Sequence, residues 1–422
     1  MSDNNILPVG WEVATLADVG EIISGGTPST TVSEYWNGDI NWISPVDLSG
    51  YAGKSIAKGK KSITVLGLQK SSAKLMPKGS VLFSSRAPIG YVAIAADELC
   101  TNQGFKSIIP GKSIFNEYLY YFLKFAKKQA EDLASGTTFK EISLKNFAKI
   151  QIPLPPLAEQ HRIVAKIEEL FSNLDKGIER LKAAQQQLKI YRQSVLKWAF
   201  EGKYTNKNIS EAKLPKGWQK IALNLLVEKI SDGPFGSNLK TSDYVEDGIR
   251  VIRLENIGEL HFKDEYRSYI TKEKYEAIKK HTVRSEDIIF SSFISECIRV
   301  TILPENIKIA INKADCFLIR VREEIIDRHY LVYYLSSREM YNKFINEVHG
   351  ATRPRINTTQ LKSAVIPIAP LEQQKIIVAE IDRRLSVCEM LEKSINSQLQ
   401  QIEALRQSIL KKAFEGNLTP KE

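Results

Sequence analysis

The sequence predicts two α/β heads carried by two long helices that pair as an antiparallel coiled coil, and three observations lead to this fold class. Residues 194–205 are SVLKWAFEGKYT and residues 408–419 are SILKKAFEGNLT, so one segment occurs twice, 214 residues apart. Each copy continues a run of five heptads whose first positions are apolar or Cys. The segments before the copies mix short β-like runs with turns and helical stretches. The chain is therefore an internal pseudo-two-fold duplication, with two different heads on a common body.

The match between the two copies continues upstream without a gap. Residues 152–165 align with residues 366–379 at the same offset, with identical Ile-Pro and Ile-Val-Ala stretches. Farther upstream the likeness is fainter: LPVGW ends at Trp11 and LPKGW ends at Trp218. Because a long internal period governs how the whole chain divides, we expect variable and repeated segments to alternate. The expected domains are a first head at 1–155, a first long helix at 156–202, a linker and second head at 203–369, and a second long helix at 370–422.

Each variable segment is expected to form an α/β head. In the first, residues 19–30 indicate a strand that enters a Gly-rich turn, and residues 80–95 indicate a hairpin that bends at Pro88-Ile89-Gly90. Residues 116–135 have the spacing of one amphipathic helix. The second variable segment repeats this order and is expected to contain one helix over residues 328–348.

The repeated segments are expected to form the long helices. Proline stands just before each one, at Pro155-Pro156 and at Pro370, where a helix tolerates it. Gly202 and Gly416 stand where the apolar pattern ends, which is a usual place for a helix to stop. A helix over residues 157–201 would be about 65 Å long, which is far longer than an ordinary globular helix. Two similar long helices in one chain most simply pair with each other, and an antiparallel pairing would put the heads at opposite ends.

The expected seam between the helices is the row of heptad a positions. This row is apolar or Cys throughout, whereas the d row is mixed, so other contacts are expected to close part of the seam. The alternative is two buried helices of one large core, which the charged and Gln-rich stretch at 182–189 disfavours. The a positions are Ile167, Leu174, Leu181, Leu188 and Val195 in the first helix, and Ile381, Cys388, Ile395, Ile402 and Ile409 in the second.

Composition and charge narrow the class of protein. The 422 residues include 59 Lys and Arg against 49 Asp and Glu, and the net charge of +10 is spread along the chain. A broad basic surface is typical of proteins that bind a polyanion such as nucleic acid. The four cysteines are scattered, which fits a reduced cytoplasmic protein and neither a disulfide framework nor a zinc site. No apolar run reaches membrane-span length, and the N-terminus does not resemble a signal peptide.

The sequence lacks the usual motifs of catalysis and cofactor binding. In GKSIAKGKK, at 53–61, the glycines are one residue too far apart for a phosphate loop, and Lys61 replaces the required Ser or Thr. No G-x-G-x-x-G follows a strand-like run, and the amino-methyltransferase signature of Asn or Asp, two prolines and an aromatic residue is absent. The five histidines are isolated, and the nuclease-like Glu-x-Lys at 211–213 has no matching upstream acid. We therefore expect no catalytic residue and no metal site in this chain.

Several motifs together resemble one known family. They are SSRAPIGYVAI at 84–94, NQGF at 102–105, LPPLAEQHRIVAKIEEL at 154–170, PLEQQKIIVAEID at 370–382, and the two AFEG endings. With the layout of the chain, they resemble the specificity subunit of type I restriction-modification systems over nearly the whole length. The resemblance implies that the heads are two target recognition domains, each reading one half of a bipartite site in double-stranded DNA. It also implies that the helices form an antiparallel coiled-coil spacer.

The resemblance implies partners for this chain as well. Two methyltransferase subunits would dock on the spacer, and a restriction subunit would join where the system has one. Adenine methylation, S-adenosylmethionine, ATP and Mg would belong to those partners, so no cofactor is expected in this chain. The duplicated body would then present equivalent docking surfaces to two identical partners, while the unlike heads would match the unlike halves of an asymmetric site.

Contacts with DNA are expected from polar loops of the heads. Arg and Lys have donors suited to guanine, and Asn and Gln have the paired groups suited to adenine. Arg353-Pro354-Arg355 is the favoured pair, because a stiff turn holds two guanidinium groups near the junction of head and helix. Asn102 is expected to be a structural turn residue. The candidates are Thr27, Ser29, Arg86, Lys106, Thr138 and Lys140 in the first head, and Ser237, Asn238, Lys240, Arg250, Arg253, Lys313, Arg353, Arg355 and Asn357 in the second.

Two other classes of function remain as alternatives. A self-contained DNA-modifying enzyme would need a cofactor or metal motif, and the sequence shows none. A coiled-coil scaffold that binds only proteins would be favoured if neither the chain nor its complex shifted duplex DNA at low salt.

Overall fold

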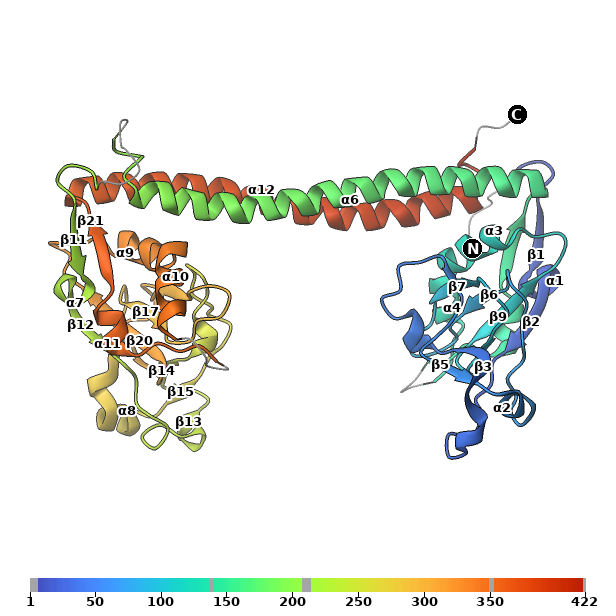
Figure 1. The fold of residues 1–422 in the computed structure, drawn as a ribbon, viewed down its shortest axis with the longest axis horizontal. Helices are drawn as coiled ribbons and strands as arrows, with labels where there is room; N and C mark the ends of the chain where they lie inside the picture. The colour runs from blue at the N-terminus through green and yellow to red at the C-terminus, as the bar shows by residue number, and fades with distance from the viewer. Residues whose placement is uncertain (1–6, 137–139, 207–213, 349–352, 420–422) are drawn as a thin grey trace. The chain divides into compact units, whose positions relative to one another are not determined.

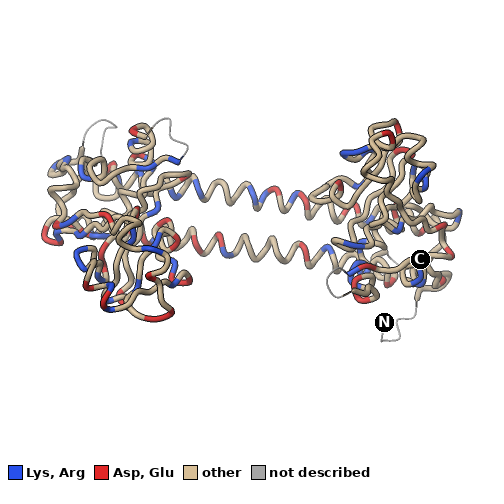
Figure 2. The backbone as a smooth tube through the Cα atoms, turned by 90° about the horizontal axis from the view of Figure 1, so that it is seen from below, with Lys and Arg blue, Asp and Glu red and all other residues tan. Residues whose placement is uncertain are grey.

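The computed structural model describes residues 7–136, 140–206, 214–348 and 353–419 (Figure 1). Lys and Arg lie among Asp and Glu in both heads and along both long helices, and not in one basic tail (Figure 2). Within these described ranges, no helix is both long enough and apolar enough to cross a membrane.

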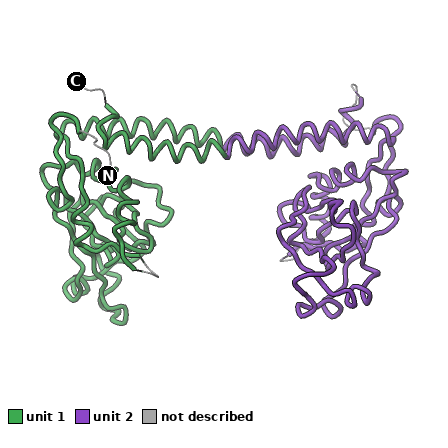
Figure 3. The backbone as a smooth tube through the Cα atoms, turned by 180° about the vertical axis from the view of Figure 1, so that it is seen from behind, with its two compact units in different colours: residues 1–181, 397–422 green, residues 182–396 purple. Residues whose placement is uncertain are grey.

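The chain divides into two compact units (Figure 3). The first unit is Met1–Leu181 with Ser397–Glu422, and the second unit is Lys182–Asn396. Each unit therefore contains one head together with a portion of each long helix.

The first head is built from two sheets with short helices around them (Figure 1). Helix α3 packs on β6 and β7, and the core of this head continues into the adjoining long helices. The five-stranded sheet has the order β2 (Gly20–Ser24), β9 (Lys106–Pro110), β6 (Val81–Phe83), β7 (Val92–Ala95) and β4 (Ser55–Ile56), and the three-stranded sheet is β5 (Lys61–Ile63), β3 (Trp36–Ile43) and β8 (Cys100–Thr101). The helices are α1 (Leu16–Val19), α2 (Val65–Gln69), α3 (Asn116–Phe125), α4 (Lys127–Asp132) and α5 (Leu144–Ala148), with 3-10 turns η1 (Ser33–Tyr35) and η2 (Pro45–Leu48).

The second head is also built from two sheets with short helices, but the numbers of strands in its sheets differ. Its four-stranded sheet is β12 (Val227–Ser231), β20 (Cys316–Val321), β17 (Ile288–Ser291) and β18 (Val300–Ile302). Its five-stranded sheet is β13 (Tyr244–Val245), β15 (Tyr269–Ile270), β14 (Ile249–Ile252), β19 (Ile309–Asn312) and β16 (Thr282–Arg284). The helices are α7 (Leu223–Leu226), α8 (Lys272–Ile278), α9 (Arg328–Leu335), α10 (Arg338–Glu347) and α11 (Thr358–Lys362), with 3-10 turns η3 (Thr241–Asp243), η4 (Leu254–Asn256) and η5 (Lys279–His281).

The local predictions for the heads are confirmed for the strands and corrected for the helices. Strands β6 and β7 form the predicted antiparallel hairpin. The single helix predicted over 116–135 is two helices, α3 and α4, and the one predicted over 328–348 is α9 and α10. In the second head the break has a clear cause: the hydroxyl of Ser337 accepts a hydrogen bond from the backbone N–H of Met340 at 3.3 Å and starts a new helix.

The long helices are α6 (Leu157–Phe200) and α12 (Leu371–Phe414), and they pack antiparallel in each unit. In the first unit, the start of α6 shares a core with the end of α12, where Leu410, Ala413 and Phe414 are buried. In the second unit, the end of α6 shares a core with the start of α12, where Ile377 and Ile381 are buried. Both helices end just before a glycine with positive φ, Gly202 and Gly416, as the sequence predicts.

The seam between α6 and α12 uses the e positions beside the a positions, together with only part of the d row. All ten a residues are buried or half-buried, and so is every e residue, from Phe171 to Ala199 and from Leu385 to Ala413. The d row is too polar to close the seam in α12, where it contains Arg384, Gln398 and Lys412. In the d row, Leu170, Gly177 and Ala184 of α6 are half-buried. The exposed apolar members are Tyr191, Trp198, Leu391 and Leu405.

A buried glutamine joins each head to its helix. Gln160 accepts from the backbone N–H of Phe115 at 2.7 Å and donates to the carbonyls of Ser113 and Pro155 at 2.9 and 2.8 Å. Gln374, 214 residues later, accepts from Asp327 N at 2.8 Å and donates to the carbonyls of Ile325 and Ala369 at 3.0 and 2.8 Å. Both side chains are fully buried. Beside them, β1 (Glu12–Thr15) pairs with β10 (Gln151–Leu154), and β11 (Gln219–Ala222) pairs with β21 (Val365–Ile368).

Candidate nucleic-acid interface

The two heads contain one corner of backbone that is the same in both. In the first head, β3 runs parallel to β8 and pairs Ile43 with Thr101. Ser44 follows the end of β3, and Asn102 follows β8 and donates its backbone N–H to the carbonyl of Ile43 at 2.9 Å. Ser44 and Asn102 therefore lie side by side where two parallel strands end.

In the second head, the same corner holds different side chains. Strand β14 runs parallel to β19 and pairs Ile252 with Asn312. Arg253 follows β14, and Lys313 follows β19 and donates its backbone N–H to Ile252 at 2.8 Å. Arg253 is thus the structural equivalent of Ser44, and Lys313 is the equivalent of Asn102. We call this pair of positions the strand-end corner.

The backbone of the strand-end corner is held by one side chain in each head. In the first head, Asp47 accepts from the N–H and hydroxyl of Ser44 at 2.8 and 2.7 Å and from the N–H of Lys60 at 2.9 Å. Burial disfavours the charged form of Asp47, but the hydrogen bonds from Ser44 and Lys60 outweigh it and lower the pKa of this carboxyl.

In the second head, Asn256 takes the place of Asp47. Its Oδ1 accepts from the N–H of Arg253 at 2.9 Å, and its Nδ2 donates to the carbonyls of Lys263 and Tyr266 at 2.8 and 2.7 Å. In both heads the side chain accepts from the N–H of the residue three positions earlier. Toward the following loop, Asp47 accepts from an N–H whereas Asn256 donates to carbonyls, which is why a carboxylate suits one head and an amide suits the other.

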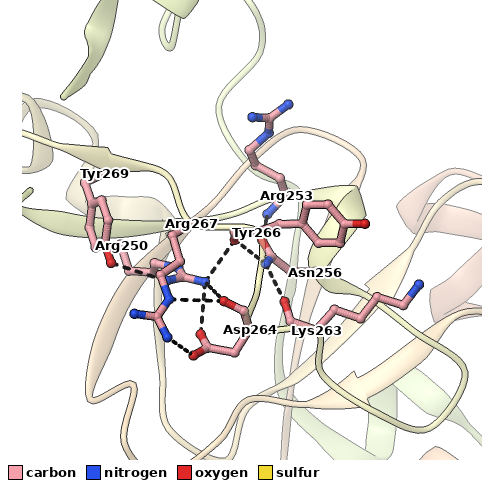
Figure 4. Close-up of polar contacts among 8 residues, drawn as sticks. All are labelled: Arg250, Arg253, Asn256, Lys263, Asp264, Tyr266, Arg267 and Tyr269. Atoms are coloured by element: carbon pink, nitrogen blue, oxygen red, sulfur yellow. Dashed lines mark hydrogen bonds and ion pairs between the residues drawn. The ribbon is translucent and has the colours of Figure 1, made fainter. Parts of the chain in front are cut away.

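Arg250 belongs to this framework and not to a surface loop. It is predicted from sequence as a DNA contact in a polar loop, but the structure places it in β14, where only 8% of it is exposed. Its Nη2 donates to Asp264 Oδ1 at 3.1 Å and to the carbonyl of Tyr266 at 2.9 Å, and its Nη1 lies 3.4 Å from the hydroxyl of Tyr269 (Figure 4). These bonds hold the segment after η4 against the sheet.

Arg253, three residues later, points away from that cluster (Figure 4). Its side chain is 37% exposed, and its Nη2 lies 2.9 Å from Oε1 of Glu255. Its Nη1 donates to Ser268 Oγ at 3.3 Å. The guanidinium lies 5.7 Å from the ring centre of Tyr244, and Nζ of Lys313 lies 5.4 Å from the same ring. The structure therefore brings together two of the predicted candidates, Arg253 and Lys313, on one aromatic ring.

A second cluster in this head contains Arg355. Its Nη2 lies 2.5 Å from Oδ1 of Asp315, and its guanidinium lies 5.8 Å from the ring centre of Phe293. Asp315 donates its N–H to Asp232 at 2.8 Å, and burial raises the pKa of the Asp232 carboxyl. Burial lowers the pKa of His281, whose Nδ1 lies 2.8 Å from the carbonyl of Asp232. Arg355 is nearly half exposed, so its charge remains open to a partner.

The first head places an acid where the second places Arg355. The N–H of Ile142 bonds to the carbonyl of Ser85 as that of Ile356 bonds to Ser292, which makes Glu141 the equivalent of Arg355. Glu141 lies 3.5 Å from both Arg86 and Lys106. Lys106 is predicted as a loop residue, but it lies in β9 and is 8% exposed, so Arg86 is the more accessible cation of this group.

The remaining predicted contacts lie at the surface or act within the fold. Thr27 donates its hydroxyl to Gln103, and Ser29 lies 2.9 Å from the hydroxyl of Thr31. Asn357 caps α11 by accepting from the N–H of Gln360 at 2.9 Å, which gives its side chain a structural role. Thr138 lies outside the described residues. Ser29 and Asn357 are exposed, and so are Lys140, Ser237, Asn238, Lys240 and Arg353.

Sequence reasoning missed Ser44, Tyr244, Glu255 and the exposed Phe235, which is 61% accessible. Phe235 precedes Gly236 in a loop that the sequence marks as polar, and an exposed aromatic residue there is a signal that was available. Asn102, predicted as a structural turn residue, accepts from the N–H of Gly104 at 2.9 Å, as such a residue does. Among the residues that the structure describes, no group of three or more His, Cys, Asp or Glu is placed to hold a metal ion.

Comparison with known families decides the identity. Residues 8–188 and 215–401 both match the type I restriction modification DNA specificity domain. The chain belongs to the specificity subunits of type I restriction-modification systems. Such a subunit is the non-catalytic member of the enzyme. The present chain is 31% identical to the MjaIX specificity subunit of Methanocaldococcus jannaschii, over 100% of its own length and 96% of that subunit. It is 26% identical to the EcoKI specificity subunit of Escherichia coli K12, over 98% and 90%.

Solved structures support the fold of this specificity subunit. A chain from a study of complex assembly and conformational transition of the type I R-M system matches with a TM-score of 0.73 and 22% identity, over 98% of this chain and 99% of that one. The HsdS subunit from Thermoanaerobacter tengcongensis matches with a TM-score of 0.59 and 22% identity, over 99% and 100%. The predicted fold class, two α/β heads and two long helices packed together, is confirmed.

Proposed function

We propose that this specificity subunit reads a bipartite DNA site, one half-site with each head, and holds two adenine methyltransferase subunits on its paired long helices. The observation that carries the proposal is the strand-end corner: two heads with the same backbone hold Ser44 and Asn102 in one and Arg253 and Lys313 in the other. A duplicated frame with unlike side chains at matched positions suits an asymmetric site, because each half can be read by a different set of donors and acceptors.

The DNA-facing surface of each head comprises its exposed polar loops. In the second head, Arg253, Lys313 and Arg355 are cations held by neighbouring side chains yet still accessible, and the exposed loop residues Ser237, Asn238, Lys240 and Arg353 extend the surface. In the first head, the corresponding set is smaller in charge and contains Thr27, Ser29, Arg86 and Lys140. Arg250, Lys106 and Asn357 are left out, because their polar groups are engaged within the fold.

The methyltransferase subunits would dock on the exposed apolar residues in the d row of the long helices. These are Tyr191 and Trp198 on α6 and Leu391 and Leu405 on α12, which are between 38% and 49% exposed. Apolar side chains at regular helical spacing suit a partner helix. S-adenosylmethionine would be bound by these subunits, and ATP and Mg by a restriction subunit where one is present.

The test is to express the chain with and without its methyltransferase and to map adenine methylation across a genome. The chain alone should methylate nothing, and the complex should methylate one interrupted, asymmetric site. Methylation by the chain alone would establish the self-contained enzyme instead. A complex that neither methylates DNA nor shifts duplex DNA at low salt would establish the protein-binding scaffold.

A further inference from the structure

The strand-end corner differs between the heads by two positive charges at matched backbone positions. In the first head, Ser44 has a short neutral side chain, and Asn102 Oδ1 accepts from the N–H of Gly104. In the second head, the same positions hold Arg253 and Lys313, both against Tyr244. Because the backbone bonds of the corner are the same, the difference lies in what the side chains offer to a ligand and not in where the chain goes.

The guanidinium of Arg253 is held at both ends. Glu255 accepts from Nη2 at 2.9 Å, Ser268 accepts from Nη1 at 3.3 Å, and the Tyr244 ring lies beside the plane. Each of these terminal nitrogens carries two hydrogens, so one on each is used in these bonds and a second is left. A planar fork that is fixed before binding loses little conformational freedom when it meets a ligand with two adjacent acceptors.

The setting of Arg253 suits a ligand with two adjacent acceptors. The carboxylate of Glu255 is 47% exposed and lies against the guanidinium, so it offsets one of the two positive charges that Arg253 and Lys313 bring to this place. The nearby carboxylate of Asp264 pairs with the buried Arg250, so its charge is already balanced within the fold. In DNA, the neutral group with two adjacent acceptors is the major-groove edge of guanine, with O6 and N7.

We propose that Arg253 reads a guanine in the half-site of the second head, and that Ser44 leaves the first head without a guanine reader at the matching position. Glu255, Ser268 and Tyr244 act as positioning residues for the fork. Lys313 adds a second donor beside it. The inference rests on the proposed function, because it requires that the head binds DNA.

The experiment uses the full complex with the methyltransferase subunits. Wild type, Arg253→Ala, Arg253→Lys and Glu255→Gln are compared on duplexes that carry every single base change in the second half-site. In Arg253→Ala, discrimination at one G·C position should fall by about 5- to 150-fold while the other positions keep theirs. Arg253→Lys should not restore it fully, because an ammonium cannot make two parallel bonds. Glu255→Gln should weaken discrimination at the same position.

The controls separate this inference from the function on which it rests. Arg267→Ala removes an exposed guanidinium of the same head, one whose Nη2 pairs with Asp264 at 2.6 Å, and should not relax any single position. Retained discrimination in the first half-site shows that each variant complex is folded. Suppose that the wild-type complex is sequence-specific. If Arg253→Ala keeps its discrimination, or loses affinity equally for all sequences, the inference is overturned and the proposed function stands. A wild-type complex with no sequence preference overturns the proposed function.

Discussion

The two heads resemble each other inside and differ at the surface, and the strand-end corner shows the boundary between the two. Asp47 and Asn256 both accept from the residue three positions earlier, so the corner has the same backbone in each head. Ser44 and Arg253 stand on that backbone with different chemistry. Buried polar contacts therefore define the frame, and a few accessible side chains at matched positions are free to define what each head binds.

The largest expected effect comes from removing one of the two heads. A chain truncated after residue 209 loses the portion of α12 that places Leu410, Ala413 and Phe414 in the core of the first unit. Residues of the same types, Leu196, Ala199 and Phe200, lie 214 positions earlier in α6, so a second copy of the fragment can supply them.

We expect this fragment to form a two-fold symmetric dimer, because each buried seam side chain contributes about 1.5–3 kcal/mol before the cost of association. With the methyltransferase, the dimer should read an interrupted palindrome of the first half-site. Sedimentation at micromolar concentration is the measurement. A folded helical monomer would show that the helix closes against its own head.

Lengthening both helices should change the gap in the site and leave both half-sites as they are. One heptad inserted at the same level of α6 and of α12 preserves the seam and adds about 10 Å of helix. At about 3.4 Å per base pair, the gap should widen by roughly three base pairs. Methylation mapping reads this directly. A changed half-site with an unchanged gap would mean that the helices do not set the spacing.

The glutamines that join head to helix should matter equally in both halves. Gln160→Leu or Gln374→Leu leaves three buried backbone groups without their partner, and each variant should lose at least about 1–3 kcal/mol of stability. Urea unfolding of the full chain measures the loss. Gln187→Leu, the same change at an exposed site on α6, should be nearly neutral. Unequal losses at 160 and 374 would show that the two junctions are not energetically equivalent.

A smaller effect is expected where Arg355 replaces the Glu141 of the first head. Arg355→Ala should weaken binding of the second half-site, and so should Arg353→Ala at the exposed end of the same turn. A phosphate contact would weaken all sequences alike and reduce the salt slope by about one, whereas a base contact would relax one position at about 1–3 kcal/mol. Salt titrations on matched and mismatched duplexes distinguish these. Unchanged affinity and slope in both variants would remove the turn from the interface.

The smallest effect should appear in acid. Residues 1–155 contain no histidine, whereas the second head holds His281 in a half-buried place where burial lowers its pKa below the ordinary 6.5. A depressed pKa means that the unfolded chain binds the proton more readily, so stability is fully present above 6.5 and falls as the pH drops toward the folded pKa. His281→Asn should flatten the pH dependence of thermal unfolding in this range. Parallel profiles for wild type and variant would exclude the effect.

The sequence predicts the long helices well because the same apolar pattern and the same helix-ending residues occur in both copies of the repeat. The helix ends at Gly202 and Gly416 follow from composition, and the antiparallel pairing follows from two copies in one chain. The use of the whole e row, with only part of the d row, does not follow, because it depends on how the partner helix is rotated. The break before α10 depends on a single serine cap in a stretch that is apolar at helical spacing.

The candidate site is harder to predict because burial there depends on distant residues. Arg250 and Arg253 are three positions apart in one segment and have the same chemistry. One is buried because Asp264, in a loop 14 residues later, folds back onto it, and the other stays accessible. No local pattern in the sequence separates them. Only the strand pairing shows which residues of the two heads occupy equivalent positions.

The contact made by Asp47 and Asn256 has a consequence for how such a protein can change over generations. The side chain reaches 13 residues ahead in the first head, to Lys60, and seven ahead in the second, to Lys263. A loop of different length and composition has thus been accommodated behind an unchanged corner. One carboxylate or amide thus holds the same corner backbone against two different loops. The residue at the corner differs, as Ser44 and Arg253 do, while the backbone beneath it stays the same, which makes the corner a place to begin redesigning a head.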